Sequence, residues 1–124
     1  MEYNLGDIVF LHNKSFKYPN GSDGDMHPFV IVAVDKGEYE MFPANYSAFL
    51  VSSEEKQENR EYNEKLKADK INRLLDDSHV KCDFLYKNIK NEDIFYKLGE
   101  VTKEQFFSFI ELYVMAKAKD KLQK

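Results

Sequence analysis

The chain has 124 residues, of which 43% are hydrophobic and 32% charged, and its formal net charge is -4 at pH 7. This length predicts one domain, residues 1–124, with a single core. No stretch reaches the roughly 20 apolar residues that a membrane span needs, and the first residues lack the pattern of a secretion signal, so we expect a cytoplasmic protein. The acidic balance argues against general polyanion binding, which relies on basic surface.

The first part of the chain alternates between strand patterns and a polar loop. Residues 7–11 (DIVFL) predict a short strand, and residues 12–27 have the Asn, Pro and Gly content of a long loop. Residues 28–34 (PFVIVAV) are almost entirely apolar, which predicts a strand buried on both faces. Residues 38–42 alternate charged and apolar side chains and predict a hairpin with one wet face.

A charged segment fills the middle of the chain. Residues 53–77 are rich in helix formers, and Tyr62 and Leu66 give them only a thin apolar stripe. A serine at position 52 or 53, followed by Glu55, resembles a helix N-cap with an acidic first turn. We therefore expect an inserted charged helical segment at 53–77, made of one or two exposed helices.

The last part of the chain predicts strands and a terminal helix. Residues 80–86 (VKCDFLY) have the two-residue period of a strand, and a further short strand follows at 94–98. Thr102 and Gln105 form a capping box that starts a helix over 103–120. The apolar stripe of this helix consists of Phe106, Ile110, Tyr113 and Val114. Together the elements predict an α+β fold, mainly β with helices, in which a small bent antiparallel sheet or barrel carries helical additions.

Two features weigh against a disulfide and a metal site. Cys82 is the only cysteine, so it cannot form a disulfide within the chain or share a zinc ion with a second cysteine, and we expect it to be a small buried side chain. Asp23, Asp25 and His27 alternate, and an extended backbone would place them on one face as cation ligands. A flexible turn at Gly24 and the lack of a fourth ligand favour the simpler interpretation, so we expect no metal and no other cofactor.

The order of several short motifs resembles the MazF/PemK/Kid toxins of bacterial toxin–antitoxin systems. Residues 6–9 (GDIV) resemble the first strand of that family, and residues 27–32 (HPFVIV) resemble its RPVVVI strand. Residues 41–43 (MFP), with Ser47 after them, resemble a loosened PLTS element. The final strands and helix of the family are matched by residues 80–86, 94–99 and 102–113. The resemblance covers most of the chain except the charged segment.

This resemblance implies both a fold and a function. The fold is a small, strongly bent antiparallel β-barrel of the MazF/PemK/CcdB toxin type, which forms a homodimer. The function is that of a growth inhibitor that works as a metal-independent endoribonuclease on single-stranded RNA, and an acidic antitoxin protein neutralises it by filling the RNA groove. In such cleavage the 2'-hydroxyl of the substrate attacks phosphorus, so the protein supplies an acid, a base and charge stabilisation.

The resemblance also implies candidate catalytic residues. His27 stands where the family has an arginine before its proline, and Ser47 represents the Thr-Ser pair of the family. An imidazole changes charge near neutral pH, so His27 can act as acid, base or cationic stabiliser. His12, at the end of the first strand, is the candidate for a second imidazole that completes an acid-base pair at the same edge of the barrel. Both histidines also fit partly exposed loop residues without a catalytic role.

Candidate substrate-binding residues lie in two loops. Lys14 and Lys17 in the first loop are candidates for phosphate contacts, and they also fit ordinary solvated lysines. Asn45 and Tyr46 follow Pro43, and the Tyr46 ring could either stack on unpaired bases or close a core.

Two other functions remain open. A catalytically degenerate MazF-like barrel, acting as a protein or nucleic-acid binding module, fits the missing arginine and the acidic composition. A structural or regulatory protein would instead use its charged segment, residues 54–77, to contact a partner.

Overall fold

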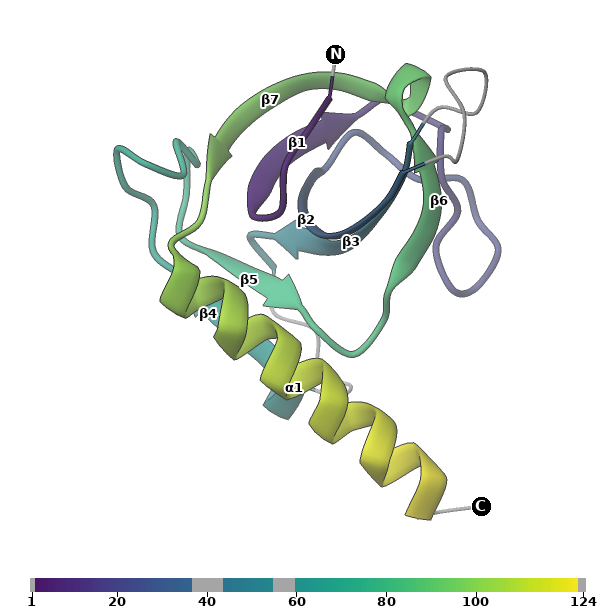
Figure 1. Ribbon diagram of the computed structural model, residues 1–124, viewed down its shortest axis with the longest axis vertical. Helices are drawn as coiled ribbons and strands as arrows, with labels where there is room; N and C mark the ends of the chain where they lie inside the picture. The colour runs from purple at the N-terminus through teal and green to yellow at the C-terminus, as the bar shows by residue number, and fades with distance from the viewer. Residues whose placement is uncertain (1, 37–43, 55–59, 123–124) are drawn as a thin grey trace.

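The computed structural model describes residues 2–36, 44–54 and 60–122, which form seven strands and one long α-helix (Figure 1). In chain order the elements are β1 Asp7–Leu11, β2 Pro28–Asp35, β3 Asn45–Ser52, the 3-10 turn η1 Arg60–Tyr62, β4 Asn63–Leu66, β5 Ser78–Lys81, β6 Tyr86–Lys90, the 3-10 turn η2 Asn91–Asp93, β7 Ile94–Glu100 and α1 Lys103–Leu122. The fold is mainly β with a C-terminal helix, which confirms the predicted α+β class. Across these described ranges, no helix has the length and apolar character to cross a membrane.

The strands form one antiparallel sheet that bends strongly. The pairing order is β4-β5-β3-β2-β1-β7, and β6 pairs with β3 as well. Register shifts interrupt the pairings of β1 with β7, β2 with β3 and β3 with β6, and such bulges increase the local twist. The pairings of the described strands do not join β6 to β7, so the sheet is not closed and the predicted barrel is not confirmed.

Two cores lie on opposite faces of the bent sheet. The core inside the bend contains, among others, Val9, Leu11, Phe29, Ile31, Tyr46, Ala48, Leu50 and Ile94. The core on the side of α1 contains Ile8, Val30, Val32, Phe49, Val51, Leu66, Val80, Cys82 and Phe109. Neighbouring residues such as Phe29 and Val30 therefore face opposite ways, which confirms the prediction that β2 is buried on both faces.

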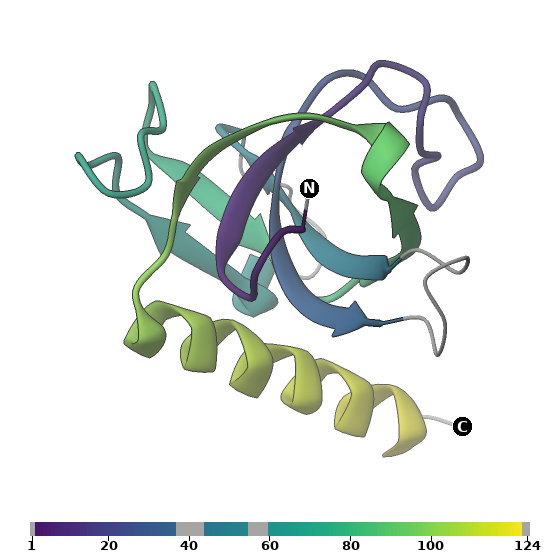
Figure 2. The same ribbon diagram turned by 45° about the horizontal axis from the view of Figure 1, so that its top comes forward.

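Helix α1 lies along one side of the sheet, away from the long 12–27 loop (Figure 2). Its predicted capping box is confirmed, because the Thr102 amide donates to the Gln105 side chain at 2.8 Å and the Gln105 amide donates to the Thr102 hydroxyl at 3.2 Å. The predicted apolar stripe is partly wrong, since Val114 is 59% exposed while Phe109 is fully buried. Apolar side chains occur on both sides of this helix, so the pattern alone did not identify the buried side.

The charged segment differs most from its prediction. The structure describes residues 53–54 and 60–77 of it, and from residue 60 onward it forms the short 3-10 turn η1, β4 and an irregular loop at 67–77 instead of α-helices. β4 pairs with β5 over its whole length and Leu66 is buried in the core. Sheet hydrogen bonds and core burial therefore outweigh the helix propensity of these residues.

Other strand predictions also differ from the structure. The single strand predicted at 80–86 is two strands, because β5 ends at Lys81 and the chain turns before β6 begins at Tyr86. The Cys82 amide donates to the Tyr62 carbonyl at 3.1 Å, which fixes the start of that turn. Strand β3 was not predicted at all, and the hairpin strand predicted at 38–42 lies outside the described residues.

The packing of α1 can be tested with a pair of phenylalanine variants. Phe109→Ala should lower the free energy of unfolding by about 3–5 kcal/mol, because it removes a fully buried ring between helix and sheet. Phe107→Ala, at a position that is 59% exposed, should change it by less than about 0.5 kcal/mol. Urea unfolding curves measure both values, and equal losses in the two variants would contradict this orientation of the helix.

Candidate functional site

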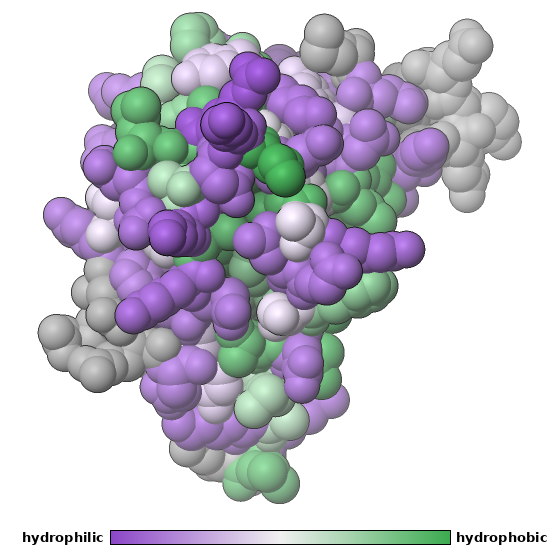
Figure 3. Space-filling model, turned by 90° about the vertical axis from the view of Figure 1, so that its left-hand side faces the viewer, coloured by the Kyte–Doolittle hydropathy of each residue, from purple (hydrophilic) through white to green (hydrophobic). Residues whose placement is uncertain are grey.

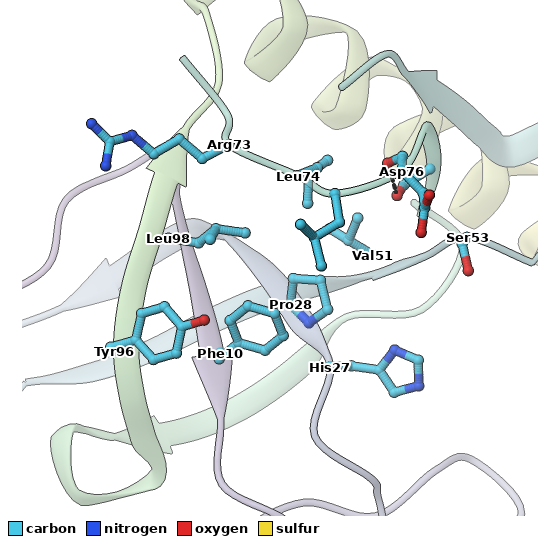
Figure 4. Close-up of a pocket in the computed structure, with 12 residues that line it drawn as sticks. Phe10, His27, Pro28, Val51, Ser53, Arg73, Leu74, Asp76, Tyr96 and Leu98 are labelled. Carbon is cyan, nitrogen blue, oxygen red and sulfur yellow. Dashed lines mark hydrogen bonds between the residues drawn. The ribbon is translucent and has the colours of Figure 1, made fainter. Parts of the chain in front are cut away.

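A cavity of about 280 Å³ opens beside the start of β2 (Figure 4). Its apolar floor consists of Phe10 from β1, Pro28 from β2, Val51 from β3, and Tyr96 and Leu98 from β7. Apolar side chains gather in the middle of the face that carries β7 and the 67–77 loop, with hydrophilic side chains around them (Figure 3). The cavity is thus an apolar depression with a polar rim, the usual character of a ligand site.

The polar rim has two chemically different ends. At one end the cavity is lined by His27, Ser53 and Asp76, which come from the start of β2, the end of β3 and the 67–77 loop, and the His27 imidazole points away from the apolar floor (Figure 4). At the other end the Arg73 side chain leaves the cavity and points away from His27 (Figure 4). A ligand that contacts both the imidazole and the guanidinium must therefore extend across the apolar floor.

Side-chain hydrogen bonds hold the 67–77 loop in place over the cavity. The Asn72 side chain is 1% exposed, and its Oδ1 accepts from the amides of Asp69 and Leu74, each at 3.0 Å. Its Nδ2 donates to the Lys67 carbonyl at 2.8 Å. These bonds fix the backbone at Arg73, where φ is 58° and lies in the left-handed region. The loop thus presents Arg73 from an ordered backbone.

β7 supports this loop through Gly99. The Glu100 amide donates to the Ile71 carbonyl at 3.1 Å, which ties the strand to the loop. A Cβ atom at Gly99 would lie 2.4 Å from the Asn72 carbonyl oxygen, closer than real Cβ contacts. Only glycine lets the strand and the loop approach to this distance.

The three predicted catalytic residues do not meet. His27 is half-buried and lines the cavity. Ser47 pairs with Ala33 near the far end of β2, roughly 20 Å from His27 at the ~3.3 Å rise per strand residue. His12 lies close to His27 along the backbone, since the Leu11 amide donates to the His27 carbonyl at 3.3 Å. However, the exposed His12 ring packs edge-on against Phe95 with centroids 5.0 Å apart, and it does not line the cavity.

The predicted substrate-binding residues also lie elsewhere. Lys14 and Lys17 are in the 12–27 loop, and Lys17 forms an exposed ion pair with Asp23 at 2.6 Å. Asn45 begins β3 at the end away from the cavity. Tyr46 is 1% exposed and its hydroxyl accepts from the Tyr3 amide at 3.1 Å, so its ring closes a core and offers no stacking surface.

Sequence reasoning missed four of the residues that define the cavity, namely Phe10, Ser53, Arg73 and Tyr96. The possible metal ligands Asp23, Asp25 and His27 do not form a cluster, and within the described ranges no group of three His, Cys, Asp or Glu side chains could hold a metal ion.

The anchoring of the 67–77 loop can be tested by Gly99→Ala. The added Cβ would displace the loop, because it would lie 2.5 Å from the Ile71 carbonyl oxygen as well. We expect faster hydrogen exchange at the Leu74 and Glu100 amides, whose acceptors lie in this loop, and unchanged protection in β2. A loss of protection throughout the sheet would contradict a local role for Gly99.

Cys82 should be chemically inert in the folded protein. Burial, as the largest cause, and the negative charge of Glu64 raise the pKa of its thiol to about 12. A thiol-specific disulfide reagent at pH 8 should therefore react only as the protein unfolds, whereas one thiol per chain should react at once in guanidinium chloride. Because the pKa is raised on folding, this thiol also makes the folded state less stable as pH rises above 9.0 toward about 12. Rapid labelling of the native protein would contradict the buried position.

Comparison with known proteins adds no family to this description of the site. No protein-family model matches the chain, and no curated protein matches it either.

Proposed function

We propose that this protein is a growth inhibitor of the toxin–antitoxin type, a metal-independent endoribonuclease that cleaves single-stranded RNA. The cavity beside the start of β2 carries the proposal, because three separate segments line it with a histidine, a serine and an arginine. Cleavage by the 2'-hydroxyl of the substrate needs proton transfer and charge stabilisation but no protein nucleophile. The groups on the rim meet that requirement.

His27 is the proposed proton-transfer residue. Its imidazole shares one end of the cavity with Ser53 and Asp76, so a phosphodiester bound there has an acid or base and a hydroxyl donor beside it. Proton transfer of this kind is worth roughly 10²- to 10⁴-fold in rate. Ser53 takes the role that the resemblance gave to Ser47, because Ser53 lines the cavity together with His27.

Arg73 is the proposed phosphate-binding residue, and it supplies the cation that the sequence lacks before Pro28. Among the side chains that the structure describes, no carboxylate forms an ion pair with Arg73. The apolar floor separates it from His27, so the ligand must be both extended and partly apolar. An unpaired nucleotide strand has this character, since its base faces alternate with charged phosphates.

We also propose that the bent sheet is a variant of the barrel found in MazF and PemK toxins. β6 and β7 stand at the two ends of the pairing path β6-β3-β2-β1-β7, and the short turn η2 connects them directly. This connection brings β6 and β7 together at the ends of the path (Figure 1). It supports a ring that the covalent chain completes through η2, in place of hydrogen bonds between β6 and β7.

Partners and location belong to the same proposal. An acidic antitoxin would neutralise the protein by covering the cavity, and both would act in the cytoplasm. The proposed assembly is a homodimer, and the outer side of α1 supports it, because Phe107, Val114 and Met115 are each more than half exposed there.

Growth and cleavage assays test the proposed function. Expression of the chain by itself should arrest bacterial growth, and His27→Ala should relieve the arrest. The purified protein should cleave single-stranded RNA in excess EDTA and leave 2',3'-cyclic phosphate ends, identified by mass spectrometry. His27→Ala should slow this cleavage roughly 100-fold or more, because it removes the proton-transfer group. Arg73→Ala should raise KM more than it lowers kcat.

Lys121→Ala provides the matched control for Arg73→Ala, since it removes an exposed cation from the end of α1. This variant should cleave RNA like the unmodified protein. The absence of both growth arrest and RNA cleavage would contradict the proposal. That result would favour the second candidate, a catalytically inactive barrel that works as a binding module, for which the separation of His27, His12 and Ser47 is the supporting observation.

A further inference from the structure

Four rings form a continuous row on the surface along β1 and β7. Phe10 and Tyr96 line the cavity with centroids 5.2 Å apart, and Phe95 follows Tyr96 at 5.2 Å. The His12 ring packs against Phe95 at 5.0 Å. This ring row, made of Phe10, Tyr96, Phe95 and His12, therefore leads from the cavity to the end of β1.

The ring row is exposed because of its place in the sheet. β7 ends the path of pairings and has β1 as its neighbour, so no other described strand covers its free edge. The β1–β7 pairing contains register shifts, which let two successive side chains of β7 face outward. Phe95 is 53% exposed and Tyr96 is 43% exposed. Adjacent large aromatic side chains at a free surface indicate an interaction site.

The charges around the ring row favour a ligand that is held mainly by stacking. His27 lies at one end of the cavity and can take a phosphate there, while Asp76 at the same end opposes a second phosphate and Arg73 lies at the other end. Lys97 on β7 is already engaged, since its Nζ lies 3.1 Å from an Asp7 carboxylate oxygen. With Lys97 engaged and a net charge of -4, electrostatic attraction contributes little to the binding of a polyanion.

We propose that the ring row is a stacking track for the bases of an unpaired nucleic-acid strand, continuous with the cavity that holds the phosphodiester. This inference rests on the proposed function for its ligand class and adds the surface that binds the flanking nucleotides. Bases of any sequence can stack on exposed rings, and Arg73 at the far end of the cavity can take one phosphate of the same extended strand. The ring row takes the base-stacking role that the sequence suggested for Tyr46, because the Tyr46 ring is buried. A duplex hides its base faces and does not fit the track.

Fluorescence anisotropy with a labelled single-stranded DNA of about 12 nucleotides tests the track, since DNA lacks the 2'-hydroxyl and is bound without being cleaved. Phe95→Ala and Tyr96→Ala should each weaken binding about 5-fold to 100-fold, the effect of losing one base-stacking contact. Phe95→Tyr keeps the ring and should bind like the unmodified protein. An unlabelled duplex of the same sequence should not compete.

Phe84→Ala is the matched control, because it removes a partly exposed ring, 39% exposed, from the turn between β5 and β6 and should leave binding unchanged. Thermal unfolding checks that each variant remains folded. The track is overturned if the unmodified protein binds no single strand, if Phe95→Ala and Tyr96→Ala bind as tightly as it does, or if the duplex competes equally well. RNA cleavage separates this outcome from the proposed function. If Phe95→Ala cleaves RNA with an unchanged KM, the nuclease function is supported and the stacking track is contradicted. If the protein binds single strands through these rings but does not cleave RNA, the stacking track is supported and the nuclease function is contradicted.

Discussion

The pairing of β3 with three other strands is the constraint on which the rest of the structure depends. β3 pairs with β2 along most of its length, with β6 at its beginning and with β5 at its end. Its side chains are buried alternately in two cores, with Leu50 in one and Phe49 and Val51 in the other. A slip of one residue would exchange these sets between the cores, so the register is strongly specified.

The candidate site occupies the ends of strands because their middles are used for packing. The register of β3 against β2 brings Ser53 to the side of the sheet where His27 enters β2. The 67–77 loop completes the rim, and its shape comes from the buried amide of Asn72. A rigid sheet thus holds the floor while loops carry the polar groups, a common division between scaffold and function.

Local patterns predicted those elements whose stability is mostly local. The capping box fixed the start of α1, and continuous apolar runs marked β1 and β2. The apolar run at residues 48–51 also indicates a strand, although β3 was not predicted from it. The resemblance instead gave this stretch a catalytic role, because Ser47 lies shortly after Pro43. Ser53 could be recognised only from the register of β3 on β2, which is a non-local property.

The roles of Arg73 and the ring row could not be predicted from the sequence for a different reason. Helix formers surround Arg73 in the sequence, and the competing structure depends on Asn72 hydrogen bonds and on Gly99 from a distant strand. Exposure of Phe95 and Tyr96 depends on β7 being the last strand of the path. Neither the hydrogen-bonding of a loop nor the edge position of a strand can be read from composition or periodicity.

The contribution of β7 to the cavity has a consequence for protein synthesis. Tyr96 and Leu98 form part of the floor, and Gly99 supports the loop that carries Arg73. A ribosome must therefore synthesise β7 before this depression can form, and β1 has no β7 partner until then. Whatever the cavity binds or cleaves, chains that terminate before β7 lack it, so a cell that makes this protein encounters its activity only from copies that contain β7.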